Sequence, residues 1–414
     1  MENTPKTAQL DRSDARVRQD EGLAGALRTF YDQIRSGDLG MLPVVVGLIL
    51  ISVVFTSINP IFLAPRNLAN LLFDAAAVGF IALGVVFVLL LGEIDLSIGS
   101  MSGLSSAILG TVWINLGFAL PFAILAAVAT GAATGLVFGF LRNRFEMPSF
   151  IATLAGLLAL LGMQLYILGP SGSINLPFAS NFVRFGQLMI MPTWFAYGVA
   201  LLWGLGVIYL GVRRSRRRSA ASLSTSGLTV VFVKAASLTA ALVFVVWYLD
   251  KGRGVPWMFA VFVVVVAIAN YALTRTQWGR SMYAVGGNPE AARRTGINIR
   301  RIRMSAFVLC SAFAALGGVF SASRLATSSL QAGTGDVNLN AIAAAVIGGT
   351  SLFGGRGSAW SALLGILVIQ SISNGLTLLN LSSSLRFMIT GGVLAIAVIV
   401  DSLARRSRTS HGRA

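Results

Sequence analysis

The stretch "LLLGEIDLSIGSMSG", residues 89–103, places two carboxylates, Glu93 and Asp95, directly after one of the most apolar runs of the chain. An acidic side chain near the centre of a bilayer costs roughly 2.5–3.5 kcal/mol on insertion scales. The pair is therefore expected to face protein, water or one end of a membrane-spanning region. Glycines and serines follow at once, which is typical of helices that break or turn back within a membrane protein.

The composition of the whole chain indicates an integral membrane protein. Hydrophobic residues make up 55% of the 414 residues and charged residues 11%, and the mean hydropathy is +0.78. Most of the chain is thus too apolar for a water-soluble globule. The 45 glycines, with few alternating β-type segments, favour packed helices over a barrel, because small residues let helices approach closely in lipid.

Twelve apolar runs are long enough to cross a hydrocarbon layer of about 30 Å. They lie near 41–58, 69–91, 97–115, 118–141, 150–169, 193–212, 229–248, 256–274, 304–322, 339–353, 358–378 and 385–401. The Gly- and Ser-rich runs 97–115 and 339–353 are expected to be broken or re-entrant. We therefore predict an all-α polytopic membrane protein with about 12 transmembrane helices, some broken. Its membrane domain spans 41–402, between an N-terminal tail, 1–40, and a basic C-terminal tail, 403–414.

The arginines predict the orientation of these helices. The loops "LRNRFEMP", "RRSRRR" and 275–303 and the tail "ARRSRTSHGRA" all fall on one side, whereas the opposite loops, such as "DKGRGVP", are poor in arginine. Because such residues accumulate on the cytoplasmic side, both termini are expected in the cytoplasm. The net charge of +17 is then explained by the arginines of the cytoplasmic loops. These arginines would also attract anionic lipid headgroups. Nucleic-acid binding is disfavoured, because the arginines lie in separate short loops.

Motifs for catalysis and metal binding are missing from the sequence. There is no G-x-x-x-x-G-K-[ST] loop for phosphates, and the one histidine, His411, lies in the basic tail. The one cysteine, Cys310, excludes a disulfide framework or a thiolate metal cluster and is expected to be a small buried residue. We expect neither catalytic residues nor a metal site. Any uphill transport would draw on an ion gradient or on a partner that hydrolyses ATP.

Two interpretations of the segment "GEIDLS" are compatible. The first is structural: Asp95 accepts hydrogen bonds from the free amides of the turn that begins "LSIG" and complements the helix dipole there. The second is functional: Glu93 and Asp95 line a pathway or its gate, as polar groups on broken helices do in transporters.

A second segment resembles the first. "VIGGTSLFGGRGSAWSALLG", 346–365, shares with 90–110 an apolar approach, a Gly-Ser-Leu turn and a following helix with small residues, which suggests an internal repeat. Both segments can open backbone and hydroxyl groups toward a cavity where a polyol would hydrogen-bond. Together with an amide in a later span, they give the candidate pathway or gate residues Glu93, Asp95, Ser97, Ser100, Thr350, Ser351 and Asn374.

The long cytoplasmic loop 275–303 contains a predicted short helix, "NPEAARRTG". Asn288 is its expected N-cap, Pro289 occupies the first helical position, and Glu290 lies in the first turn. Arg293 and Arg294 come late in this helix, and Gly296 ends it. A capped two-turn helix between two spans has no core of its own to bury. It is more naturally a docking element for a soluble domain than a loop that merely happens to be helical.

Four segments in order, "EIDLSIGSMSG", "PSFIATLAG", "YAVGGNPEAARRTGINIRRIR" and "AIAAAVIGGTSLFGGRGS", resemble the permease subunit of bacterial ABC importers for ribose, galactose, arabinose and xylose. The resemblance covers roughly residues 40–402. Most of that group have Gly-Gly-Ile-Asp at the first motif. Glu93 in place of the second glycine, and the extra pair of spans around "RRSRRRSAASLSTSG" and "DKGRGVP", are similar to the xylose permeases.

The resemblance implies a homodimer in the bacterial inner membrane, with the pathway at the two-fold interface. A cytoplasmic ATPase subunit would use the ATP, a periplasmic sugar-binding protein would deliver the sugar, and this chain would bind no cofactor. The resemblance also implies that a coupling helix seats in the ATPase. The expected coupling residues are Gly286, Gly287, Asn288, Pro289, Glu290, Ala291, Ala292, Arg294 and Gly296.

Alternative functions remain at this point. A proton-coupled sugar transporter would use Glu93 or Asp95 as proton carrier, but would not need a docking helix in its longest cytoplasmic loop. A scaffold or receptor would not need two Gly/Ser-interrupted helices. Within the ABC class, permeases for another pentose or hexose, a nucleoside, an autoinducer or a branched-chain amino acid are further alternatives.

Overall fold

The computed structural model describes residue 25, residues 42–382 except 226 and 334, and residues 384–385, 388–392, 395 and 399. The N-terminal tail and the basic C-terminal tail lie outside the described residues, apart from residue 25. The rest divides into two compact units, one formed by residues 191–255 and the other by residues 42–190 with the described residues from 256 onward.

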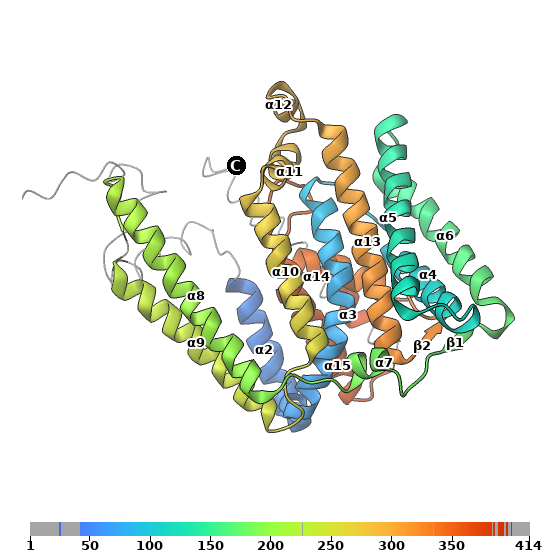
Figure 1. Ribbon diagram of the computed structural model, residues 1–414, viewed down its shortest axis with the longest axis horizontal. Coiled ribbons are helices and arrows are strands. Elements are labelled where there is room, and N and C mark those ends of the chain that lie inside the picture. Colours follow the sequence, from blue (N-terminus) through green and yellow to red (C-terminus); the bar gives the residue numbers. More distant parts are fainter. Residues whose placement is uncertain are drawn as a thin grey trace, which may run out of the picture. The chain divides into compact units, whose positions relative to one another are not determined.

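The larger unit is a helix bundle (Figure 1). Its helices are α2 (Leu42–Ile58), α3 (Pro65–Leu90), α4 (Ile98–Gly110), α5 (Leu120–Arg144), α6 (Ser149–Leu168), α7 (Asn181–Gln187), α10 (Trp257–Arg275), α11 (Gln277–Gly287), α12 (Pro289–Arg294), α13 (Ile299–Leu325), α14 (Val337–Ile347) and α15 (Ala359–Leu378). A short antiparallel pair, β1 (Ser173–Asn175) and β2 (Thr327–Ser329), lies at the end of the bundle opposite α12.

The smaller unit is a hairpin of two long helices, α8 (Thr193–Ala220) and α9 (Leu228–Asp250). Most of its apolar residues are exposed, which suits helices that face lipid. The arginines of "RRSRRR" occupy the last turns of α8, beside the turn to α9.

The core of the larger unit forms around α3, α4 and α13. Nearly every residue of α3 from Ala75 to Leu90 is buried, and so is almost all of α4. A helix that is apolar or small on all sides belongs in the middle of a bundle. Glycine allows the close approach: a Cβ on Gly84 would lie only 2.7 Å from the Cys310 carbonyl oxygen of α13.

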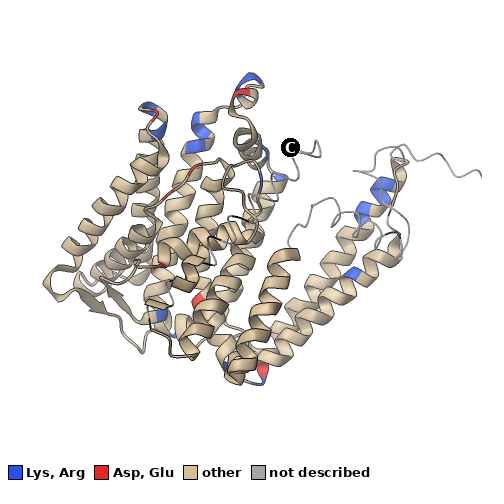
Figure 2. Ribbon diagram, turned by 180° about the vertical axis from the view of Figure 1, so that it is seen from behind, with Lys and Arg blue, Asp and Glu red and all other residues tan. Residues whose placement is uncertain are grey.

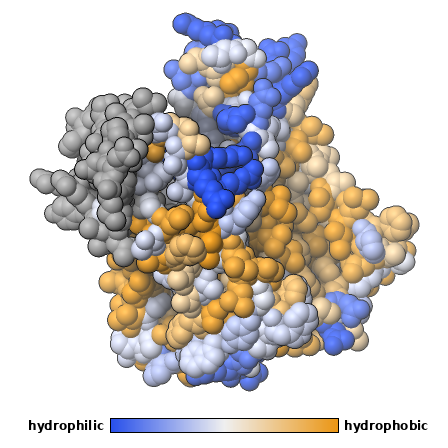
Figure 3. All heavy atoms as spheres, turned by 60° about the vertical axis from the view of Figure 1, so that its left-hand side comes forward, coloured by the Kyte–Doolittle hydropathy of each residue, from blue (hydrophilic) through white to orange (hydrophobic). Residues whose placement is uncertain are grey.

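Eight helices in the described part of the chain are long and apolar enough to cross a membrane. They are α3, α5, α6 with its 3₁₀ extension, α8, α9, α10, α13 and α15. The prediction of an all-α polytopic membrane protein is thereby confirmed. Figure 3 shows apolar side chains over a broad area of the face in view.

Three of the remaining predicted spans are helices shorter than 18 residues. The segments 97–115 and 339–353, which were expected to be irregular, are short helices: α4 has 13 residues and continues into a π-turn at Thr111–Asn115, and α14 has 11. Helix α2 has 17 residues. The last predicted span, 385–401, lies largely outside the described residues.

Candidate translocation and coupling site

Two helix breaks meet inside the larger unit. The first is the loop 91–97 between α3 and α4, and the second is the loop 348–358 between α14 and α15. The backbone N–H of Gly355 donates a hydrogen bond of 2.9 Å to the carbonyl oxygen of Leu90. Gly92 has a φ of +71° and faces Phe353 across this contact, so both loops use glycine to approach each other. The two segments that resemble each other in sequence therefore lie in direct contact.

Asp95 organises the first loop. Its Oδ1 accepts hydrogen bonds from the Ser97 backbone N–H at 2.8 Å and from the Ser97 hydroxyl at 2.6 Å. This arrangement confirms the prediction that Asp95 accepts from the amides of the turn before α4. The side chain is buried, and its Oδ2 has no hydrogen-bond partner among the residues that the structure describes.

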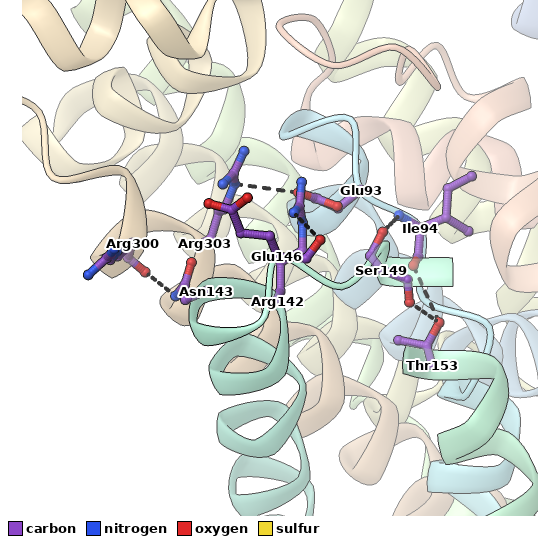
Figure 4. A network of polar contacts seen from close by, with 9 residues as sticks. All are labelled: Glu93, Ile94, Arg142, Asn143, Glu146, Ser149, Thr153, Arg300 and Arg303. Atoms are coloured by element: carbon purple, nitrogen blue, oxygen red, sulfur yellow. Dashed lines mark hydrogen bonds and ion pairs between the residues drawn. The ribbon is translucent and has the colours of Figure 1, made fainter. Parts of the chain in front are cut away.

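The beginning of α6 holds the same loop from the other side. The Ser149 hydroxyl accepts from the Ile94 N–H at 3.2 Å, and the Thr153 hydroxyl accepts from the Leu96 N–H at 3.0 Å. Both side chains are buried, and Figure 4 shows them beside Ile94. They satisfy backbone donors that no helix or strand serves, which an apolar interior requires.

Glu93 belongs to a buried ion-pair cluster. Its Oε1 lies 2.8 Å from Nε of Arg142, at the end of α5, and 3.4 Å from Nε of Arg303, near the start of α13 (Figure 4). Only 6% of Glu93 is exposed. A carboxylate buried to this extent needs such partners, because an unpaired buried charge lowers the stability of the fold. The cluster joins the first loop to two membrane-spanning helices.

Sequence reasoning missed this role of the arginines. The sequence indicates Arg142 and Arg303 only as topology signals, but both side chains pair with Glu93. Most Lys and Arg of the larger unit gather at the end that carries α12 (Figure 2). A second ion pair that the sequence did not indicate joins Asp74 of α3 to Arg324 of α13 at 2.7 Å.

The remaining pathway candidates separate into two groups. Ser97 and Ser100 are buried at the end of the first loop and the start of α4, and Thr350 and Ser351 are buried in the second loop. Asn374 lies roughly 22 Å further along α15 and exchanges two hydrogen bonds, of 2.7 and 3.2 Å, with Asn67. Its contacts are those of a helix-to-helix tie.

The predicted short helix is present as α12, Pro289–Arg294, but Gly286 and Gly287, which were expected to belong to the same element, end the preceding helix α11. The Asn288 side chain accepts from the Ala291 N–H at 3.0 Å, Pro289 is the first helical residue, and Gly296 ends the turn with a φ of +82°. Glu290 and Arg293 form an exposed ion pair of 2.9 Å on its surface. Helix α12 extends beyond the ends of α10 and α13, which leaves it free to meet a partner (Figure 1).

A bundle of apolar helices that contains two polar loops in contact, and an exposed capped helix at one end, is the architecture of a polytopic membrane protein, and helix breaks of this kind are typical of transporters. The chain belongs to the family described as "Branched-chain amino acid transport system / permease component", whose model matches residues 67–398.

Relatives of known name match over nearly the whole chain. The xylose transport system permease protein of Escherichia coli (strain K12) is 34% identical over 91% of this chain and 95% of the relative. The ribose import permease protein of Bacillus subtilis (strain 168) is 33% identical over 86% of this chain and 90% of the relative. The resemblance to permeases of the monosaccharide ABC group is thereby confirmed. No solved structure matches the chain.

Proposed function

We propose that this chain is the permease subunit of an ATP-driven importer for a monosaccharide, with D-xylose as the first candidate. The observation that supports the proposal most directly is the exposed, capped helix α12 in a chain that aligns with 95% of a xylose permease. A ribose permease at 33% identity makes ribose the principal competitor for the substrate.

The proposed assembly is a homodimer in the inner membrane with both termini in the cytoplasm. Each α12 seats in a cytoplasmic ATPase subunit, and an extracytoplasmic binding protein delivers the sugar. ATP is used by the partner, and this chain binds no cofactor. Helices with apolar outer faces, such as α8 and α9, contact lipid.

The mechanism is a shift of population between two states. ATP binding to the ATPase favours one arrangement of the permease and hydrolysis releases it, so the ATPase must bind the two arrangements with different affinity. The loops 91–97 and 348–358, with their backbone and hydroxyl groups, are the proposed gate region. Because they lie at helix breaks, they can rearrange without unwinding a continuous helix.

Uptake into proteoliposomes tests this proposal. The vesicles hold the permease with its ATPase, enclose ATP, and are given labelled xylose with the binding protein outside and a protonophore present. The proposal predicts uptake that needs ATP and both partners and survives the protonophore. Competition by unlabelled ribose and galactose then ranks the sugars. If ribose competes better than unlabelled xylose, ribose becomes the proposed substrate.

A proton-coupled mechanism is the second candidate, because Asp95 has a buried oxygen without a hydrogen-bond partner in the described chain. Glu93 is a poorer candidate for a proton carrier, since its carboxylate is engaged in ion pairs with two arginines. Uptake that is abolished by the protonophore and indifferent to ATP would favour this second mechanism and contradict the first.

A further inference from the structure

Helix α11, which leads into α12, makes direct contact with the second loop. The Tyr283 hydroxyl donates a hydrogen bond of 2.9 Å to the carbonyl oxygen of Gly357. Burial raises the pKa of the Tyr283 phenol above its usual value of 10.0, so the hydroxyl keeps its proton at physiological pH. The contact therefore persists under the conditions in which a transporter works.

The last turn of α11 also lies against the point where the two loops join. A methyl group on Gly286 would overlap the carbonyl oxygen of Leu90 and lie 2.7 Å from the backbone nitrogen of Gly355. These are the two atoms of the hydrogen bond between the loops. A Cβ on Gly354 would in turn lie 2.8 Å from the Gly286 carbonyl oxygen. Three stretches of backbone thus meet with no room for a side chain.

The other end of α11 is anchored separately. The Trp278 indole N–H donates to the Ser305 hydroxyl of α13 at 2.9 Å, and the Trp278 ring packs against Phe87 of α3. Helix α11 is consequently held at its beginning by α13 and α3 and at its end by the two loops. If α12 is displaced, α11 is expected to move with it and to shift both loops. The contacts between α11 and the loops are close-packed, so they cannot absorb the movement.

We propose that Gly286 and Tyr283 are positioning residues that transmit displacement of α12 to both helix-break loops at once. Gly286 packs against the hydrogen bond between Gly355 and Leu90, and Tyr283 binds the second loop by its hydrogen bond to Gly357. This inference rests on the proposed function, because it assumes that a partner displaces α12. It adds the residues through which that displacement reaches the gate region.

The test measures sugar imported per ATP hydrolysed in proteoliposomes that hold the permease, its ATPase and the binding protein. Tyr283→Phe removes one hydroxyl and is expected to lower this ratio by about two- to tenfold. Gly286→Ala, which forces the junction apart, should lower it at least as much. Both variants should still co-purify with the ATPase, since Tyr283 and Gly286 lie on α11 and contact the two loops, and neither substitution changes α12.

Two matched controls use the same substitutions elsewhere. Gly162→Ala lies on α6 with no atom near the new methyl group, and Tyr271→Phe lies on the exposed surface of α10. Both should keep the wild-type ratio. Wild-type ratios for Tyr283→Phe and Gly286→Ala would overturn the inference while leaving the permease function intact.

The outcomes also separate this inference from the proposed function. If Gly286→Ala does not reach the membrane, the import ratio of Tyr283→Phe alone tests the inference, because loss of one hydroxyl leaves the packing unchanged. A wild-type permease that imports sugar without ATP would contradict the proposed function, and the inference with it.

Discussion

At the scale of single residues, two carboxylates one residue apart are stabilised in different ways. Glu93 is matched by opposite charge, from Arg142 and Arg303. Asp95 is matched by hydrogen-bond donors, from Ser97. A buried carboxylate can be stabilised by opposite charge or by hydrogen-bond donors, and the two positions use one of these each. Substitutions that keep the shape and remove the charge should therefore affect the two positions differently.

Glu93→Gln is expected to destabilise the protein by about 2–3 kcal/mol, because it leaves two arginines in a partly buried cluster without their carboxylate. This loss of stability is smaller than for a fully buried ion pair, since the arginine side chains are 21% and 23% exposed to solvent. Thermal unfolding in detergent measures it. Glu290→Gln, at an exposed ion pair, is the stability control and should shift the midpoint little. Equal midpoints for the two variants would refute the cluster's role.

Asp95→Asn should be tolerated far better than Asp95→Ala. Asparagine keeps the Oδ1 acceptor for both Ser97 donors, whereas alanine leaves those buried donors unpaired at a cost of about 1–3 kcal/mol. Unfolding midpoints and uptake are compared for the two variants. If Asn is as damaging to uptake as Ala while the protein stays folded, the charge on Asp95 has a role of its own, and a proton-carrying function gains support.

At the scale of elements, the sequence predicts helix identity and caps better than helix length. The cap of α12 follows from Asn288 and Pro289, because capping is a local interaction. The glycines and serines of 97–115 and 339–353 indicate irregular helices, but they do not give the lengths of α4 and α14, since both residues are common in continuous membrane helices as well. The ion pair of Glu93 with arginines from α5 and α13, and the contact of α11 with both loops, depend on residues far apart in the sequence. Hydropathy cannot reveal such pairings.

Asn288→Ala should loosen α12 without disturbing the bundle. Loss of an N-cap costs about 1 kcal/mol, equivalent to about fivefold faster opening of a short helix. Hydrogen exchange of the amides in 289–296 measures this change. Asn288→Ser keeps a capping oxygen and should exchange close to wild type. Exchange that is unaltered in Asn288→Ala would mean that contacts other than the cap hold α12.

At the scale of the whole molecule, long apolar helices and the placement of arginine together define a permease with distinct ends. In the larger unit the end with α12 gathers most of the basic residues (Figure 2), and in the smaller unit the arginines lie beside the turn from α8 to α9. By the positive-inside rule we expect each of these ends to face the cytoplasm. The family match over 67–398 begins in the first turn of α3 and includes every later helix of the described chain.

Cysteine labelling tests this orientation with little background, because the single native cysteine, Cys310, is fully buried. A membrane-impermeant maleimide applied to spheroplasts should label Lys251→Cys, at the turn after α9, and spare Ser222→Cys, between α8 and α9. Inside-out vesicles should give the opposite result. The reverse of this pattern would overturn the assigned topology.

The central claim is that an ATPase acts on this permease through α12. The most direct test places a photo-crosslinking residue at Glu290 on α12 in the complete complex, and at Phe178 near the opposite end as the control. Both positions are exposed. We predict an adduct with the ATPase subunit from Glu290 and none from Phe178. A complex that imports sugar yet gives no adduct from Glu290 would contradict the claim.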